Sequence, residues 1–430
     1  MSERKSTIGM PIEQGFYTLI LGIVPEGQEP IYFYDSSNEK ANYCTIYGLN
    51  LHESISDIVP TCKIEVEVPY IWLDNQYLTD GTLVTIELKL NDELPPEIKK
   101  LNEKAYVFRL FGIEKIEDHG IFVRVILNCV IDFLAGYGDG NVLNCPCTTS
   151  KVFENCATEY KFTEKDIDNT KDAQLWIANG RNIYQFLSYC CQYGWADDTS
   201  AMMWAIDRNK KLYYKNIVKC FNPNNSGAGC SSCGCAGGNC QNIRVGSLGV
   251  PVVSSVPFGL NNVKLGAYGI DADVFNFMQD DKCEYDYKNI LSNELTKTSE
   301  STCVCKNGPA KQGQGWFPFN VGNHNENYFK ALTQNRQILA TYSTFLSVRF
   351  SPSTAIATKN SILPFFEAFH LFDTCNIEYD VHAENDKFIK MESLSAKCMV
   401  ASIDVNVTQK HAATKIQFVM QGFNTKGKTN

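Results

Sequence analysis

The densest group of chemically reactive side chains is a run of cysteines in a glycine-rich segment. Its members are Cys220, Cys230, Cys233, Cys235 and Cys240. Four thiolates at such short spacing can complete a tetrahedral site for zinc or for an iron–sulfur cluster. The spacing matches neither a paired CxxC ribbon nor a ferredoxin run, so disulfides and free thiols stay open as alternatives. A metal or a disulfide would restrain the segment equally, because either crosslink limits the freedom of a loop that has no core.

Twelve of the remaining thirteen cysteines form two groups. Possible additional ligands from other loops are Cys145, Cys147, Cys156, Cys303 and Cys305. Cysteines scattered through apolar stretches, which we expect to be small buried hydrophobes, are Cys44, Cys62, Cys129, Cys190, Cys191, Cys375 and Cys398. The first fifteen residues do not resemble a signal peptide, so the 18 cysteines indicate synthesis in a reducing cytoplasm.

Catalytic readings of these residues are weak. A nucleophilic cysteine needs a neighbouring base, and none of the 6 histidines lies close in sequence to a cysteine cluster. His324 is interpreted as a surface loop residue rather than a ligand. Acidic residues in predicted turns, where a carboxylate caps its own backbone, are Asp35, Asp74, Asp80, Asp139, Asp197 and Asp198. A muramidase-type carboxylate pair is the alternative, but it is defined by separation in space. No nucleotide-binding, zinc-protease or hydrolase motif occurs, so we predict that the protein is not an enzyme.

Composition places the chain among densely folded proteins. Hydrophobic residues make up 44% and aromatic residues 12%, with 20% charged, and 430 residues suffice for two or three domains. The net charge of −9 argues against wrapping nucleic acid on the outer surface, where lysine and arginine would have to neutralise phosphates. It is compatible with DNA that passes without binding. No apolar run reaches the roughly 18 residues that span a bilayer.

The N-terminal third alternates between apolar and polar residues. Period two is clear in 62–69 and 83–90, and 106–113 and 121–127 flank the Asp118–Gly120 turn like a hairpin. These patterns predict an antiparallel barrel or sandwich. The glycine-rich stretch 135–144 predicts the first boundary.

The middle of the chain predicts a helix packed on a hairpin. Apolar spacing indicates a helix of about four turns that ends near Tyr193, and 201–215 is typical of strand, turn and strand. Aromatic residues that we assign to the core between them, rather than to a ligand platform, are Tyr184, Phe186, Tyr189, Tyr193, Trp195 and Trp204. Residues 222–249 are too poor in large apolar groups to form a core, and 296–315 is a second stretch of low order.

The C-terminal part predicts a helix over 326–342, a strand over 345–350, and a final hairpin from 398–407 and 414–420. An apolar cluster that belongs either to a buried strand or to a subunit interface contains Phe365, Phe366, Phe369, Leu371 and Phe372. We therefore predict an α+β, mainly β, chain: an N-terminal β-barrel domain over 1–138, a mixed α/β region over 139–325 with a cysteine-rich loop at 216–249, and a C-terminal barrel-like domain over 326–430.

Three segments resemble the bacteriophage baseplate-hub family, which includes the late control protein D group. They are the strands at 79–84 and 108–116, the helix and hairpin at 179–214, and the closing 397–420. The resemblance implies two related β-barrels joined by a mixed α/β region, and a trimer whose six barrels form a pseudo-hexameric ring. The cysteine-rich insertion departs from the family pattern.

That resemblance implies a structural hub of a tail baseplate, located in the virion and assembled in the host cytoplasm. Its expected partners are two further copies of the chain, a tail tube protein, and spike or tip proteins, with DNA passing through the lumen. One alternative is a metal-bearing tail-tip or receptor-binding protein. The other is a tail-associated peptidoglycan hydrolase.

Overall fold

The computed structural model describes most of the first half of the chain and the strands of the second half. The described residues are 17–35, 44–75, 77–90, 104–133, 144–178, 181–221, 241–246, 264–270, 282–289, 295–301, 313–320, 331, 334–335, 338–339, 342, 344–350, 355–357, 362–364, 369–383, 387–390, 396–408 and 412–420. Among them, no helix is both long and apolar enough to cross a membrane.

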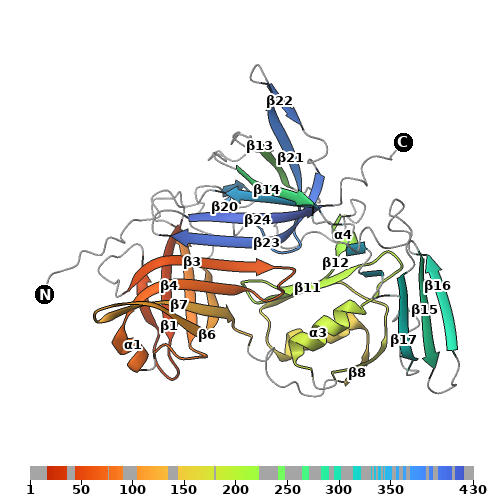
Figure 1. Cartoon of the computed structure of the whole chain (residues 1–430), viewed down its shortest axis with the longest axis horizontal. Coiled ribbons are helices and arrows are strands. Elements are labelled where there is room, and N and C mark those ends of the chain that lie inside the picture. The colour runs from red at the N-terminus through yellow and green to blue at the C-terminus, as the bar shows by residue number, and fades with distance from the viewer. Residues whose placement is uncertain are drawn as a thin grey trace.

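The first part is almost entirely strand (Figure 1). Its elements are β1 (Tyr17–Val24), β2 (Ile31–Asp35), β3 (Thr45–Ser54), β4 (Thr61–Pro69), α1 (Tyr70–Asp74), β5 (Leu83–Leu90), β6 (Lys104–His119) and β7 (Phe122–Ile131). The β6–β7 hairpin turns at the predicted place, and Gly120 takes a positive φ of 69° there, as glycine does without steric cost.

The second part mixes helices with short strands. Its elements are β8 (Asn144–Cys147), α2 (Thr149–Glu159), β9 (Glu164–Ile167), β10 (Gln174–Ile177), α3 (Ile183–Gln192), β11 (Met202–Ile206), β12 (Lys211–Asn216) and α4 (Ile217–Phe221). The predicted helix on a hairpin is confirmed: α3 packs on β11, which pairs with β12. The helix is shorter than predicted because Asn182 caps it in a reciprocal pair with Gln185, while Trp176 belongs to β10.

The third part returns to strands. They are β13 (Gln241–Gly246), β14 (Lys264–Ile270), β15 (Lys282–Asn289), β16 (Leu295–Ser301), β17 (Gly313–Asn320), β18 (Thr344–Phe350), β19 (Ala355–Ala357), β20 (Ile362–Pro364), β21 (Thr374–Ala383), β22 (Lys387–Lys390), β23 (Ala396–Thr408) and β24 (Ala412–Met420). The predicted strand at 345–350 and the final hairpin are confirmed as β18 and β23–β24. The prediction of low order over 296–315 is wrong at its ends, where β16 and β17 pair with β15. β16 contains threonines and β17 contains aromatic residues, and both residue types are enriched in strands.

One large sheet joins the two β-rich ends of the chain. Its order is β2-β1-β5-β6-β7-β4-β3-β23-β24-β18-β14-β13-β21-β22. The seam between the N-terminal and C-terminal strands is the antiparallel β3–β23 ladder, which runs from Ser54 opposite Ser402 to Gly48 opposite Thr408. In Figure 1 the blue β23 and β24 lie directly above the orange β3 and β4.

The mainly β, antiparallel character that the sequence predicts is confirmed, but no closed barrel is found in the described residues. The N-terminal strands end at β2 and β3, and no described ladder joins these two edges. At the C-terminal end, β23 pairs with both β24 and β21, so ladders run in a cycle through β18, β14 and β13. The link between β13 and β14 is one residue pair, Gly246 with Lys264, which is too short to close a regular barrel.

The core crosses all three predicted ranges. One cluster of buried side chains extends from Leu19 in β1, through Phe153 in α2 and Trp204 in β11, to Met420 in β24. A smaller cluster combines Ile55 with residues from the middle and the C-terminal strands. Packing of this kind holds the parts together through the hydrophobic effect, which favours any arrangement that removes apolar surface from water.

Part of the predicted 326–342 helix supplies a polar anchor to the middle region. Gln334 and Asn335 are helical and buried. Asn335 Nδ2 donates to the carbonyl oxygens of Gln192, the last residue of α3, at 3.0 Å and of Gly194, two residues later, at 3.2 Å. Its Oδ1 accepts from Met202 N at 3.1 Å. One side chain therefore satisfies main-chain groups at the end of α3 and at the start of β11.

An ionic cluster stabilises the β3–β23 seam. His52 Nδ1 lies 2.6 Å from Asp404 Oδ1, and His52 Nε2 lies 2.8 Å from Asp57 Oδ2. The hydrogen bond to Asp404 is the largest cause that raises the pKa of His52, and the pKa reaches about 9. Since the usual pKa of histidine is about 6.5, the folded protein holds the proton more tightly than the unfolded chain does.

The seam should therefore weaken as pH rises. The contribution of His52 is fully present below about pH 6.5 and is lost as pH rises through about 9. Replacing His52 by Gln should lower the free energy of unfolding at pH 6 by about 1 kcal/mol, after allowance for its partial exposure. Thermal unfolding of wild type, H52Q and D404N at pH 6 and pH 10 measures this. An equal loss of stability at both pH values would contradict the assignment.

Candidate functional site

The most concentrated polar site in the described residues is an ion pair with no access to solvent. Glu53 is the second-to-last residue of β3, and Arg208 lies in the turn between β11 and β12. Their side chains are 0% and 1% exposed. Arg208 Nη1 donates to Glu53 Oε1, and the main-chain N–H of Arg208 donates to Glu53 Oε2 at 2.8 Å. Both carboxylate oxygens are thus held by one residue from a distant part of the chain.

Asp207 shapes the turn that delivers Arg208. Its Oδ1 accepts from the main-chain N–H groups of Asn209 and Lys211, each at 2.9 Å. Its Oδ2 accepts from Tyr213 Oη at 3.2 Å and lies 3.5 Å from His370 Nδ1. Lys210 completes the turn with a φ of 59°, a conformation that costs energy for a residue with a side chain. Asp207 offsets this cost by accepting hydrogen bonds from the backbone on both sides of Lys210.

The C-terminal part contributes the third side of the site. Arg208 Nη2 donates to the carbonyl of Phe369 at 3.1 Å. Beyond it, the His370 N–H donates to Asp373 Oδ2 at 2.9 Å, and Val400 N donates to Asp373 O at 2.8 Å. The guanidinium of one turn therefore ties β3 to the segment that leads into β21. We call Glu53, Asp207, Arg208, His370 and Asp373 the junction cluster.

Burial dominates the electrostatics of this cluster. Burial raises the pKa of Glu53 above its usual value, and the charge of Arg208 opposes that shift. Burial is the largest single effect on Arg208 and disfavours its charged form, but the attractions of Glu53, Tyr106 and Asp207 together outweigh it and raise the pKa of the arginine. A buried pair of this kind costs much desolvation energy and is stable only when its hydrogen bonds are complete. The arrangement can fix the relative position of three segments, whereas its buried carboxylates are out of reach of a substrate in solution.

The predicted turn carboxylates have local roles where the structure describes them. Asp197 Oδ1 accepts from Thr199 N at 2.9 Å, as an aspartate does when it caps its own turn. Asp74 and Asp80 are exposed at the end of α1 and in a turn. Asp35 ends β2, and Asp139 and His324 lie outside the described residues. The carboxylate pair of a hydrolase stays untested.

Most of the predicted metal ligands lie outside the described residues. These are Cys230, Cys233, Cys235, Cys240, Cys303 and Cys305. Cys220 lies at the end of α4, partly exposed, where the cysteine-rich segment begins. Within the described part of the chain, no group of three histidine, cysteine or acidic residues is arranged to hold a metal.

The other candidate ligands fall in three different settings. Cys145 lies in β8, opposite Trp176 of β10. Cys147 is disulfide-bonded. Cys156 is buried on the inner face of α2, where burial raises the pKa of its thiol to about 12. A thiol with so high a pKa is mostly protonated at neutral pH, although metals bind the thiolate form.

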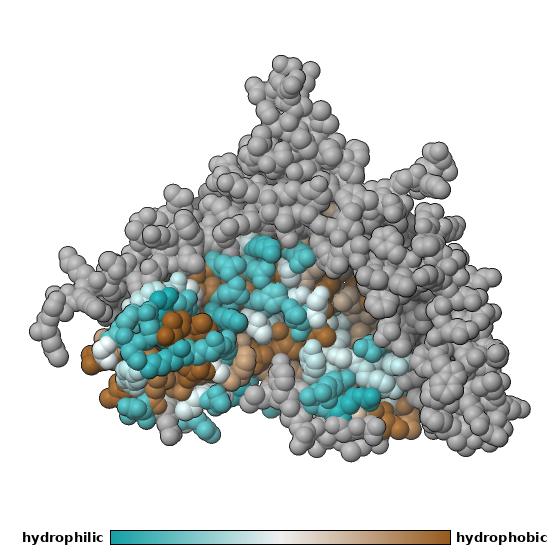
Figure 2. Space-filling view, in the orientation of Figure 1, coloured by the Kyte–Doolittle hydropathy of each residue, from teal (hydrophilic) through white to brown (hydrophobic). Residues whose placement is uncertain are grey.

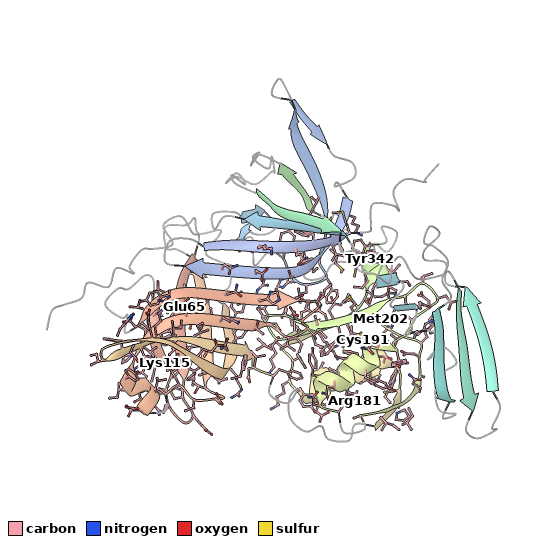
Figure 3. The ribbon with its side chains drawn as sticks, viewed as in Figure 1. Glu65, Lys115, Arg181, Cys191, Met202 and Tyr342 are labelled. Carbon is pink, nitrogen blue, oxygen red and sulfur yellow. The ribbon has the colours of Figure 1, made fainter. Side chains whose placement is uncertain are left out.

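The cysteines predicted to be buried hydrophobes are confirmed. Each is buried and outside any disulfide: Cys44, Cys62, Cys129, Cys190, Cys191, Cys375 and Cys398. Figure 3 shows Cys191 beside Met202, and its thiol lies 3.4 Å from the Met202 carbonyl oxygen. The assignment of aromatic residues to the core between helix and hairpin is confirmed for five of the six, since Phe186 and Trp204 are buried and Tyr184, Tyr189 and Tyr193 pack against the core. Trp195, the sixth, is only partly buried. In the apolar cluster near 370, Phe369, Leu371 and Phe372 are buried in the core, and Phe365 and Phe366 lie outside the described residues.

Sequence reasoning missed two elements of the site. It interpreted 207–210 as a simple turn and did not identify Glu53 as its partner, which lies 155 positions away. It also missed α2 and the buried Asp172, which accepts from Thr149 N and Trp195 N, each at 2.9 Å. The helix had a signal: Thr148 caps it, and the buried residues Val152, Phe153, Cys156 and Ala157 recur at helical spacing.

Removing one charge of the junction pair should be far more damaging than removing both. Glu53→Gln leaves the Arg208 guanidinium buried without its counter-charge, so we expect a loss of about 3–5 kcal/mol in the free energy of unfolding. The double variant E53L/R208M should recover much of that loss. The exposed ion pair Lys115–Asp118 provides the matched control, and D118N should leave thermal unfolding almost unchanged. A small effect of E53Q, equal to that of D118N, would contradict the structural role.

Comparisons with known proteins agree on the fold. No family model matches the chain, and no curated protein matches its sequence. The tail protein from Neisseria meningitidis MC58 superposes with a TM-score of 0.51 at 7% identity, over 94% of this chain and 96% of that one. The 43 kDa tail protein of prophage MuSo2 from Shewanella oneidensis also gives 0.51, at 8% identity, over 94% and 97%. This chain therefore has the fold of phage tail proteins along nearly its whole length.

Proposed function

We propose that the protein is a non-enzymatic structural hub subunit of a bacteriophage tail baseplate. In this proposal three copies form a pseudo-hexameric ring in the virion, which connects the tail tube to the spike or tip and lets DNA pass. The observation that carries the proposal is the fold, shared over almost the full length of two phage tail proteins. Because likeness at such low identity concerns the fold, the hub role and the partners are our inference.

The polar chemistry of the described residues supports a scaffold. Its most buried charges, Glu53, Asp207 and Arg208, are occupied in joining parts of the chain to one another. Enzymes place perturbed charges in clefts that substrates can reach. Here the perturbed groups lie in the core, where they hold the strands of two β-rich ends in a fixed arrangement.

The charge of the chain supports the passage of DNA. A net charge of −9 gives a surface that repels phosphates on average, so DNA would slide rather than bind. A hub in the path of the genome needs this property.

Exposed apolar side chains on the N-terminal part of the chain support contact with another subunit. Phe111 and Ile121 are 58% and 75% exposed, and Ile71 and Ile116 are also exposed. Figure 2 shows apolar residues among polar ones on the N-terminal part of the molecule. Apolar groups with a polar surround are typical of protein interfaces.

The oligomeric state tests the ring. Light scattering of the purified chain should give a mass of about three times the 48.3 kDa of one copy. Phe111→Asp and Ile121→Asp place charges at exposed N-terminal positions and should shift the protein toward monomer. Ile177→Asp, at an exposed position of β10, is the matched control and should leave the mass unchanged. A monomer that degrades peptidoglycan would favour the hydrolase alternative and contradict the hub.

The cysteine-rich segment gives a separate prediction. We propose that Cys220, Cys230, Cys233, Cys235 and Cys240 hold a structural zinc ion or an iron–sulfur cluster, a property also compatible with a tail-tip or receptor-binding protein. Elemental analysis of protein purified in reductant without chelator should find about one zinc, or iron with sulfide, per chain. Replacing Cys233 and Cys235 by Ala should abolish metal binding, whereas C191A should leave the metal content unchanged. Protein free of metal with all these thiols intact would contradict the site.

A further inference from the structure

Two pairs of buried cysteines lie directly opposite each other across antiparallel strands. Cys62 of β4 is the register partner of Cys129 of β7. Cys375 of β21 is the register partner of Cys398 of β23. None of the four cysteines is in a disulfide, and their exposed fractions lie between 0% and 1%.

The ladder geometry brings each pair within reach of a covalent bond. Directly opposed residues of an antiparallel pair have Cα atoms about 4.5 to 5.5 Å apart, and their side chains point to the same face of the sheet. A disulfide accepts Cα separations of about 4.4 to 6.8 Å. Neither pair therefore requires the backbone to move far. By contrast, Cys191 lies in α3, where its thiol faces the Met202 carbonyl oxygen.

We propose that Cys62–Cys129 and Cys375–Cys398 are two latent disulfide sites, one in the N-terminal strands and one in the C-terminal strands. The oxidant is a small organic disulfide. A protein thiolate attacks it, forms a mixed disulfide and releases one small thiolate. The opposite protein thiolate then attacks the mixed disulfide, closes the cross-strand bond and releases the second. The two protons of the protein thiols end on the two small thiols, so the protein pair is oxidised and the reagent is reduced.

Burial makes both sites slow to react. It raises the pKa of the Cys129 thiol to about 12, and it raises the pKa of Cys62 well above its usual value. The attacking thiolate is therefore scarce, and reagent reaches it only when the strands open. In a reducing cytoplasm the pairs stay as thiols, and outside the cell they become oxidised gradually.

The two bonds would restrain different parts of the sheet. In Figure 1, β4 and β7 lie in the orange N-terminal part and β21 and β23 in the blue C-terminal part. The first bond joins adjacent central strands of the N-terminal part, and the second joins β21 to β23, the pairing that completes the cycle of C-terminal ladders. Oxidation would thus stabilise both β-rich ends without adding a contact between copies.

Peptide mapping tests the proposal on the full chain. Reduced protein is incubated with cystamine a few degrees below its unfolding midpoint, remaining thiols are alkylated, and a non-reducing digest is analysed by mass spectrometry. We expect linked peptides for Cys62–Cys129 and Cys375–Cys398. The unfolding midpoint should rise by about 3–8 °C and return on reduction. In wild type, all four residues alkylated, or any of them linked to another cysteine, would overturn the assignment.

Two variants separate the cross-strand bonds from general oxidation. Cys129→Ala should leave Cys62 alkylated while Cys375–Cys398 still forms. Cys191→Ala, at another buried position that has no opposed cysteine in a ladder, should leave both bonds intact. Cys62 that becomes linked in the C129A variant would overturn the pairing. If C129A does not fold, the peptide map of the oxidised wild-type protein alone tests the pairing.

Discussion

The architecture depends on a buried charge that three distant segments must neutralise together. Arg208 lies in a tight turn, its counter-ion Glu53 lies near the end of a strand of the N-terminal part, and its other partner is the carbonyl of Phe369. An unpaired guanidinium in the core would cost several kcal/mol. Only an arrangement that places β3, the β11–β12 turn and residues 369–373 side by side avoids this cost. The interaction therefore selects one arrangement among those that the hydrophobic core alone would allow.

The same logic recurs at the other contacts between parts. Asn335 satisfies the end of α3, and His52 links Asp57 to Asp404 across the β3–β23 seam. Hydrogen-bonded polar groups in a core specify geometry more than they add stability, because a misplaced partner leaves a group unsatisfied. A subunit that must present fixed surfaces to several neighbours needs such definition. The proposed hub role would require this definition, and the fold itself is shared with two tail proteins.

Local patterns predicted local structure well. Alternation in 83–90 and 398–407 and the turn at 207–210 identified strands and hairpins, because a face that packs on a core imposes period two. Burial of the scattered cysteines followed from their apolar neighbours. The junction cluster could not be predicted, because the sequence does not tell whether a charged residue lies at the surface or is paired in the core. Whether the strands close into a barrel could not be predicted from the sequence either, because closure depends on which edge strands pair. The described ladders do not join the N-terminal edge strands β2 and β3.

A map of the assembled tail at side-chain resolution tests the account most directly. It would show the neighbours of the chain and whether Glu53 and Arg208 stay paired within each copy. The account predicts three copies in a ring around an open channel, between the tube and the spike, with the junction cluster intact in every copy. A chain found at the tip of a fibre, or a ring in which the parts are arranged differently about Arg208, would contradict it.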